Sequence, residues 1–241
     1  MNTRLLVGLT SAAMMTSTLA LAGAAEAATI SFSDSFGLES TNVIDALLSV
    51  QKFDASLGTL TKVSLAFNGL IQGDAKIESL DSQAANVTFN LGGSLTLLDG
   101  TNTLPNPIFD VAVSASDSKA VSAFDGLIDF AGTSGASFEG LVASTSGTEV
   151  YTDSTLLSFF TGSGPLDFLF TALASSQVTG AGNIISQITT QAGAGITVTY
   201  HYDPAETESV PEPSVLLGLG TVLGAGLLTL RKRGNALVDE A

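Results

Sequence analysis

The stretch ITVTYHY at residues 196–202 decides the fold of this chain. Apolar or aromatic side chains stand at every second position, and threonine or histidine stands between them. Successive side chains of a β-strand point to opposite faces, so this alternation predicts a strand with one buried and one solvated face. Strands of this kind are typical of antiparallel sheets that pack one face against a core.

The same alternation recurs upstream, where apolar residues again occupy every second position. Further strands of this kind are predicted, in chain order, at residues 30–33, 61–71, 86–98 and 109–113. Residues 166–173 are densely apolar instead, which is consistent with a buried strand. Residues 42–53 fit a helix nearly as well as a strand, and we expect a strand because the neighbouring segments are strands.

Four features should interrupt these strands. Asp34 takes the next position on the apolar face of the first strand, so the alternation ends there. Gly92 and Gly93 inside a strand pattern indicate a bulge or a sharp bend. Residues 131–148, rich in Gly, Ser and Thr, predict either a loop or a glycine-weakened strand pair. Asp153 is placed to cap a short helix before residue 160.

Many short strands, frequent turns and little helical periodicity predict an all-β fold. The expected architecture is one antiparallel β-sandwich or jelly-roll-like domain. A parallel β-helix is the alternative, but the strands lack the fixed repeat period of that architecture. The two ends of the chain add an N-terminal signal helix and a C-terminal transmembrane helix, for reasons given below.

Composition narrows the class of protein. The 241 residues contain no Cys, which excludes disulfides, zinc-thiolate sites and a Cys nucleophile. The formal net charge is −15, so the surface repels phosphate backbones and nucleic acid is not an expected partner. Trp is absent and there are 3 Tyr, which argues against a platform for stacking sugars.

The N-terminus reads as a secretory signal peptide over residues 1–27. Arg4 supplies the positive charge, and residues 5–21 are apolar or small. Ala25 and Ala27 form an A-x-A site, so cleavage is expected before Ala28. The signal predicts export by the Sec translocation machinery.

The C-terminal segment has three parts in a fixed order. An uncharged run at residues 214–230 would form a helix of about 26 Å, close to the ~30 Å hydrocarbon core of a bilayer. Basic residues are retained on the cytoplasmic side, so the cluster behind this run orients the helix. The motif before the run is Val210-Pro211-Glu212-Pro213, and the cluster behind it is Arg231-Lys232-Arg233.

This order resembles the PEP-CTERM sorting signal of bacterial cell-surface proteins. The resemblance implies recognition by an exosortase, a membrane-embedded cysteine transpeptidase, and removal of the helix, so that membrane contact through residues 214–230 is transient. The tail at residues 234–241 is longer than that pattern expects. The alternative is an ordinary membrane anchor that is never cut.

Five segments follow in chain order from these assignments. They are a signal peptide (1–27), a β domain (28–203), an acidic linker (204–209), the sorting signal (210–233) and a cytoplasmic tail (234–241). The precursor is expected in the inner membrane, and the mature protein at the cell surface or outside the cell.

The β domain also carries a short motif of its own. The sequence KFDASLGTL at residues 52–60 resembles the FDxxLGTL feature of the choice-of-anchor E domain, and the strand ending at Tyr202 fits as well. That family carries no assigned activity. In physical terms, Phe53 should enter the core, Asp54 should form turn hydrogen bonds, and Gly58 should supply an unusual backbone angle.

Residues that could carry chemistry are few. His201, the single His, lies on the polar face of the last predicted strand, and no GxSxG elbow accompanies it. Asp125 and Asp129 would lie about 13 Å apart on one strand face, too far for a glycosidase pair. Calcium is the remaining site hypothesis, with residues 74–81 and 117–129 as the densest acids. No catalytic residue, cofactor or metal ligand is assigned.

These observations predict an exported, non-enzymatic protein of the cell surface or extracellular matrix, processed by an exosortase. By family resemblance its partners include exopolysaccharide, in the setting of biofilm formation. The alternatives are a carbohydrate- or calcium-binding module held permanently by its C-terminal helix, and a secreted hydrolase.

Overall fold

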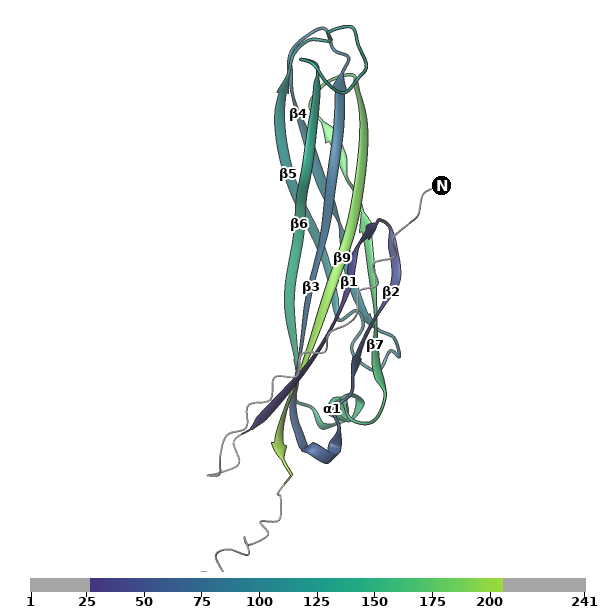
Figure 1. The fold of residues 1–241 in the computed structure, drawn as a ribbon, viewed down its shortest axis with the longest axis vertical. Coiled ribbons are helices and arrows are strands. Elements are labelled where there is room, and N and C mark those ends of the chain that lie inside the picture. Colours follow the sequence, from purple (N-terminus) through teal and green to yellow (C-terminus); the bar gives the residue numbers. More distant parts are fainter. Residues whose placement is uncertain (1–26, 206–241) are drawn as a thin grey trace, which may run out of the picture. The chain divides into compact units, whose positions relative to one another are not determined.

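The structure is a computed structural model that describes residues 27–205. Over this range two antiparallel sheets pack face to face as a β-sandwich (Figure 1). The all-β, antiparallel prediction is therefore confirmed. The predicted sorting signal and cytoplasmic tail lie outside the described residues, as does the predicted signal peptide apart from Ala27.

Sheet A has the strand order β1-β9-β3-β6. Its central strands are the longest, because they pair with each other over their whole length. Strand β9 pairs with β1 on one side and with β3 on the other. The strands are β1 (Ala28–Ser40), β9 (Ile184–Pro204), β3 (Gly58–Ser79) and β6 (Gly135–Tyr151).

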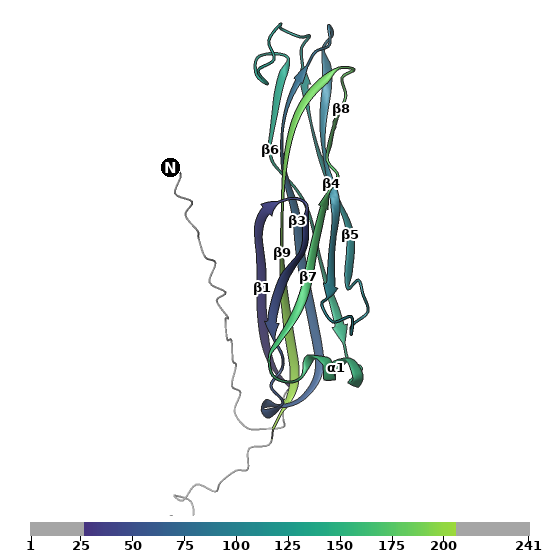
Figure 2. The ribbon, with the colours of Figure 1, turned by 90° about the vertical axis from the view of Figure 1, so that its right-hand side faces the viewer.

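Sheet B has the order β2-β7-β4-β5, and the short strand β8 also pairs with β4 (Figure 2). Its strands are β2 (Val43–Gln51), β7 (Pro165–Ala174), β4 (Ala85–Asp99), β5 (Phe109–Val121) and β8 (Gln177–Thr179). The expectation of a strand over residues 42–53 is confirmed by β2.

Two short helices complete the described chain, η1 (Ala55–Leu57) and α1 (Ser154–Phe160). The predicted cap of α1 is confirmed, because the Asp153 carboxylate accepts the backbone N–H groups of Thr155 and Leu156. Such a cap satisfies donors that have no partner within the helix.

Aromatic side chains join the two sheets through the core. Phe67 of β3 stacks on Phe109 of β5 with ring centroids 5.1 Å apart. Phe89 of β4 meets Phe138 of β6 at 5.9 Å. Each pair links sheet B to sheet A, and offset or tilted rings at such distances stabilise a core beyond the area they bury. The core therefore lies between the two sheets and extends along the length of their strands.

The first strand continues past Asp34, where the alternation of apolar residues ends. Asp34 pairs with Ile196 in the β1–β9 ladder, and β1 continues to Ser40. Its carboxylate accepts the N–H of Ser49 in β2 at 2.7 Å and that of Ser35 at 2.8 Å. The polar side chain thus finds donors at the edge of the core, so the backbone ladder is not interrupted.

The glycine pair in β4 is not a bulge in that strand's pairing with β5, whose register is continuous through it. On the other side of β4 the register is continuous as well, since β7 pairs as far as Gly93, the N–H of Ser175 donates to the carbonyl of Gly92, and β8 continues in the same register. A Cβ on Gly93 would stand 2.4 Å from both the Ile71 side chain and the Leu173 carbonyl. Close packing, not a bend, requires glycine there.

Residues 131–148 form neither a loop throughout nor a pair of strands. Their larger part belongs to the single strand β6. Small or polar residues at inward positions such as Ala143, Thr145 and Gly147, and valines at outward positions 142 and 150, hide the alternation, because they give weak contrast between the faces.

Candidate functional site

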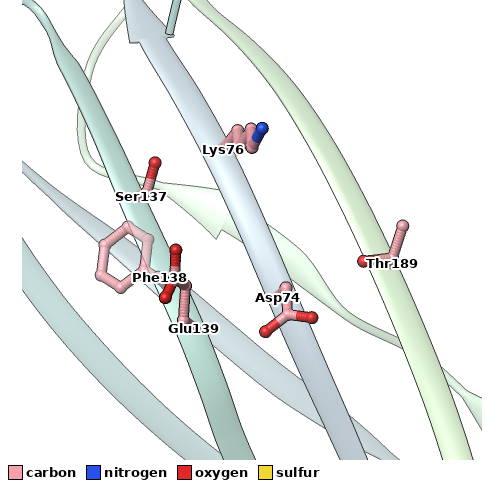
Figure 3. A pocket seen from close by; sticks show the side chains of 6 residues that line it. All are labelled: Asp74, Lys76, Ser137, Phe138, Glu139 and Thr189. Atoms are coloured by element: carbon pink, nitrogen blue, oxygen red, sulfur yellow. The ribbon is translucent and has the colours of Figure 1, made fainter. Parts of the chain in front are cut away.

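An open hollow of about 350 Å³ lies on sheet A where β3 runs between β6 and β9 (Figure 3). Three strands supply its lining, which mixes carboxylates, hydroxyls and one ammonium group. The lining residues are Asp74 and Lys76 of β3, Ser137, Phe138 and Glu139 of β6, and Thr189 of β9.

A β-bulge shapes this hollow. The β3–β6 register shifts between Gly73 and Ala75, so β6 carries one extra residue at this point. Gly140 takes a positive φ of 64° there, and its N–H donates to the Asp74 carboxylate at 2.7 Å. The bulge turns β6 away from β3 and opens the space beside Asp74.

Lys119 ties the rim of the hollow to the other sheet. Its ammonium group donates to the carbonyl of Ser137 and lies 5.1 Å from the centroid of the Phe138 ring. Lys119 belongs to β5, so this contact fixes the edge of sheet B against the edge of sheet A.

The chemistry of the hollow is that of a polar contact surface. Asp74, Lys76, Glu139 and Thr189 are exposed, so water competes for every hydrogen bond they could make to a ligand. Small-molecule sites usually enclose their ligand with apolar walls. This arrangement can hold a hydroxyl-bearing or charged group at the surface, and it has no buried acid and base poised for catalysis.

The acids proposed as calcium ligands are bound locally instead. The carboxylate of Asp81 accepts the N–H of Gly182 at 2.6 Å, and that of Asp129 accepts the N–H of Ala131 at 2.9 Å. Asp125 accepts the N–H of Leu127. Within residues 27–205, no three Asp, Glu or His side chains converge as a metal site requires. The calcium hypothesis therefore has no assembled site in the described part of the chain.

Asp125 and Asp129 do not share a strand face, contrary to expectation. Both lie in the loop between β5 and β6, where each accepts from a residue two positions later. Between them Leu127 and Ile128 are 64% and 56% exposed. The pattern of two acids around an apolar run thus marks turn caps, not a strand.

Beneath this loop lies a buried carboxylate that the sequence did not indicate. Glu78 is fully buried at the end of β3. It accepts the hydroxyl of Ser134 at 2.6 Å and the N–H of Phe130 at 2.8 Å. Both donors lie in the β5–β6 loop, so Glu78 anchors the loop to the sheet. Glu78 directly follows buried Ile77, so the alternation of the strand does not predict that it is buried. Its two donors are more than 50 residues away, so their spacing in the sequence does not indicate the contact.

His201 lies where the sequence placed it, half-buried in β9 and paired with Lys62 in the ladder. Burial, and then the charge of Lys62, lower its pKa, so the imidazole is neutral at pH 7. Within the described residues its backbone carbonyl accepts the Thr61 hydroxyl at 3.0 Å, and no side-chain acid or hydroxyl is hydrogen-bonded to its imidazole. It is a strand residue of the polar face.

The motif at residues 52–60 behaves as its chemistry predicts. Phe53 is 1% exposed, and its ring lies 5.7 Å from that of Tyr200. The Asp54 carboxylate accepts the N–H of Ser56, which lowers the pKa of Asp54. Gly58 has a φ of 147°. The motif therefore closes the turn that leads from β2 into β3.

The hollow itself was missed by sequence reasoning, although one signal for it exists. Gly140 lies within β6, and a glycine in a strand can mark a bulge. The residues that the bulge would face could not be known, because the pairing of β6 with β3 joins distant segments.

The fold of the described residues is an antiparallel β-sandwich. In residues 27–205 no helix has the length and apolar character needed to cross a membrane. No family model and no curated protein matches the chain. One solved structure, that of infectious bursal disease virus Gx strain, is similar at 11% identity and a TM-score of 0.20. The match covers 80% of this chain and 42% of that one. A likeness this low carries no conclusion about fold or function.

Proposed function

We propose that this chain is an exported, non-enzymatic protein of the cell surface or extracellular matrix, and that an exosortase processes it. The carrying observation is the order of three parts near the C-terminus. A Pro-Glu-Pro motif at residues 211–213 precedes an uncharged run at 214–230 and a basic cluster at 231–233. The A-x-A site before Ala28 supports entry into the Sec pathway.

The position of β9 supports attachment through the C-terminus. β9 is the last strand before the acidic linker, and it is hydrogen-bonded to β1 on one side and β3 on the other. A force applied beyond Pro204 therefore acts on a strand held along both edges. A domain attached to a membrane or matrix through its last strand benefits from that arrangement.

Surface charge supports a location outside the cell. Between Ala28 and Val210 the chain has 19 acidic residues against four lysines. Strong net charge of one sign keeps a protein soluble and disfavours polyanionic partners such as nucleic acid. The expected partners of this chain are the exosortase, the Sec machinery, the membrane during processing, and exopolysaccharide.

Replacing residues 211–213 with three alanines tests the sorting step. Two prolines around Glu212 keep the motif extended and accessible, since neither can donate to a helix or sheet. We expect the variant to be exported but to keep residues 214–241, as measured by mass spectrometry of membrane and surface fractions. Deletion of the host exosortase should trap the same species.

A matched variant replaces Glu206, Thr207 and Glu208 of the linker with alanine, and should be processed like the wild type. If the wild-type protein in surface fractions retains residues 214–241, and the 211–213 variant is indistinguishable from it, the sorting proposal is refuted. The chain would then be a permanently anchored module. Binding of matrix polysaccharide with and without calcium would test the ligand of such a module.

A further inference from the structure

Strand β6 forms one edge of sheet A. It pairs with β3, and within residues 27–205 no strand pairs with its other side. The row of backbone groups on an edge strand is a template for another strand. The segment that matters here is residues 141–150, below the bulge, which we call the open β6 edge.

The backbone groups on the open β6 edge can be assigned from neighbouring hydrogen bonds. In an antiparallel sheet, each residue directs its N–H and its C=O to the same side of the strand, and successive residues alternate between the two sides. The N–H of Ser79 donates to Ser134 just before β6, and the N–H of Leu80 donates to Asn183 just before β9. Odd residues of β3 therefore face β6, and the register pairs them with odd residues of β6 below the bulge. Even residues from 142 to 150 direct N–H and C=O to the free side.

Above the bulge this edge is blocked. The Ser137 carbonyl accepts the ammonium group of Lys119, and Gly140 turns the strand out of register. A lysine and a bulge are devices by which natural sheets prevent edge pairing. Below the bulge, eight consecutive residues at 141–148 carry no charge.

The other edge strands of the two sheets have protection. The registers of β1 and β2 are each interrupted by a shift, and β5 carries Asp110, Asp117 and Lys119. The part of β9 beyond the end of β1 is also unpaired on one side, over residues 184–189, but it is shorter. Residues 141–148 of the open β6 edge are the longest uncharged edge segment within the described residues.

The open β6 edge is complementary to a second copy of itself. With a twofold axis at Ser146, antiparallel pairing places Val142 opposite Val150 of the other copy and Ser144 opposite Thr148. These two valines are 45% and 54% exposed and would cover each other. Glu149 would face an alanine instead of another acid. Even residues lie opposite even residues, so five pairs would exchange about ten backbone hydrogen bonds.

We propose that two copies of this chain associate through their open β6 edges, antiparallel and centred on Ser146. The contact joins the two copies of sheet A into one continuous sheet. Main-chain hydrogen bonds hold it, and the valine pairs at its ends fix the register. The proposal does not depend on the sorting reaction.

The absence of Cys from the chain gives a direct test. In Ser146→Cys, two cysteines would stand opposite each other in a hydrogen-bonded pair, about 5.5 Å apart at Cα, within the ~4.4–6.8 Å range of disulfides. The full chain in detergent, under mild oxidation, should become a covalent dimer of twice the monomer mass on a non-reducing gel.

Single variants on the same strand face control for the register. Ser144→Cys alone and Thr148→Cys alone should not cross-link. In each variant the two identical cysteines of the dimer would be four residues apart along the paired strands, a separation of ~13 Å. A mixture of the two variants should cross-link. Association through residues 214–230 alone would not produce this pattern, so the test separates the two contacts.

A charge variant tests the noncovalent contact. Ser146→Lys would place two ammonium groups opposite each other, and should shift the sedimenting species from dimer to monomer while the circular dichroism spectrum remains that of a folded β domain. Asn68→Lys, on the exposed face of β3 beside Ser146 in the register, should leave the dimer intact. If Ser146→Cys cross-links no faster than Ser144→Cys, or if the lysine variants behave alike, the proposal is wrong.

Discussion

At the scale of single residues, Gly58 has a role that its sequence context indicated. It has a positive φ of 147°, and a Cβ there would stand 2.0 Å from the carbonyl oxygen of Asp203. The clash is with backbone, which cannot move aside without disturbing the β3–β9 ladder. Glycine is therefore required by both conformation and space.

Gly58→Ala should lower the free energy of unfolding by about 1–3 kcal/mol, the cost of a strained backbone residue. Urea denaturation followed by circular dichroism measures this loss. The matched control is Gly37→Ala in β1, where a Cβ would meet nothing within 4 Å. The control should change stability by less than about 0.5 kcal/mol. Equal effects in the two variants would show that the Gly58 site can relax.

Two tyrosines make stability depend on alkaline pH. Burial, helped by the charges of Glu149 and Asp99, raises the pKa of Tyr151 from 10.0 to about 12. Burial also raises the pKa of Tyr200, whose hydroxyl donates to the Gln51 carbonyl at 2.7 Å. Both phenols keep their protons in the folded state at a pH where the unfolded chain has lost them.

We therefore expect the contribution of these tyrosines to stability to be constant well below pH 10 and to fall as pH rises from 10 toward 12. The unfolded state binds fewer protons in this window, so the free energy of unfolding decreases with pH. Tyr151 accounts for up to about 2–3 kcal/mol of the loss at pH 12. Tyr151→Phe should show a shallower decline in urea titrations from pH 9 to 12. A decline as steep as that of the wild type would contradict the assignment.

At the scale of elements, alternation in the sequence found the strands but not their ends. The stretch predicted over residues 61–71 lies inside β3, which runs from Gly58 to Ser79. Backbone pairing continues into residues such as Asp74 and Lys76, whose side chains stay on the solvent face. A strand extends as far as a neighbouring strand pairs with it, and the local sequence does not show which segment that neighbour is.

The loops posed a different difficulty. The acids around Leu127 resembled a strand face or a calcium loop, and they proved to be caps of single turns. The buried contact of Glu78 with Ser134 joins residues on either side of two strands and could not be inferred from spacing. Local hydrogen bonds follow from residue type, whereas the pairing of distant polar groups follows only from topology.

Glu78→Ala should release the β5–β6 loop. The variant leaves the N–H of Phe130 and the hydroxyl of Ser134 without their buried acceptor, at a cost of about 1–3 kcal/mol. Hydrogen exchange at residues 122–134 should accelerate more than exchange elsewhere. Glu139→Ala, an exposed acid on β6, is the control and should leave that exchange unchanged. Equal protection of the loop in both variants would contradict the anchoring role.

At the scale of the whole molecule, the two ends of the described sandwich have different character. Ala28 pairs with Tyr202, and Gly58 pairs with Pro204, so the first and last strands begin and end together. At the other end of the same strands, the loops after Ser79, Val121 and Thr179 adjoin one another through backbone hydrogen bonds. One end of the domain therefore holds the start of β1 and the end of β9, and the other carries loops such as that of Leu127 and Ile128.

The exported protein should begin at or near Ala28. Strand β1 starts at this residue, and Ile30 and Phe32 pack against the core, with the Phe32 ring 6.1 Å from that of Tyr200. Cleavage after Ala27 keeps the whole of β1, whereas cleavage several residues later would remove these contacts and expose one edge of β9. N-terminal sequencing of protein from the cell surface measures the position directly. Ala27→Leu, which blocks the small-residue site, should abolish cleavage at this bond. Recovery of surface protein that still begins at Met1 would reject the signal peptide, and with it the route by which the sandwich is proposed to leave the cell.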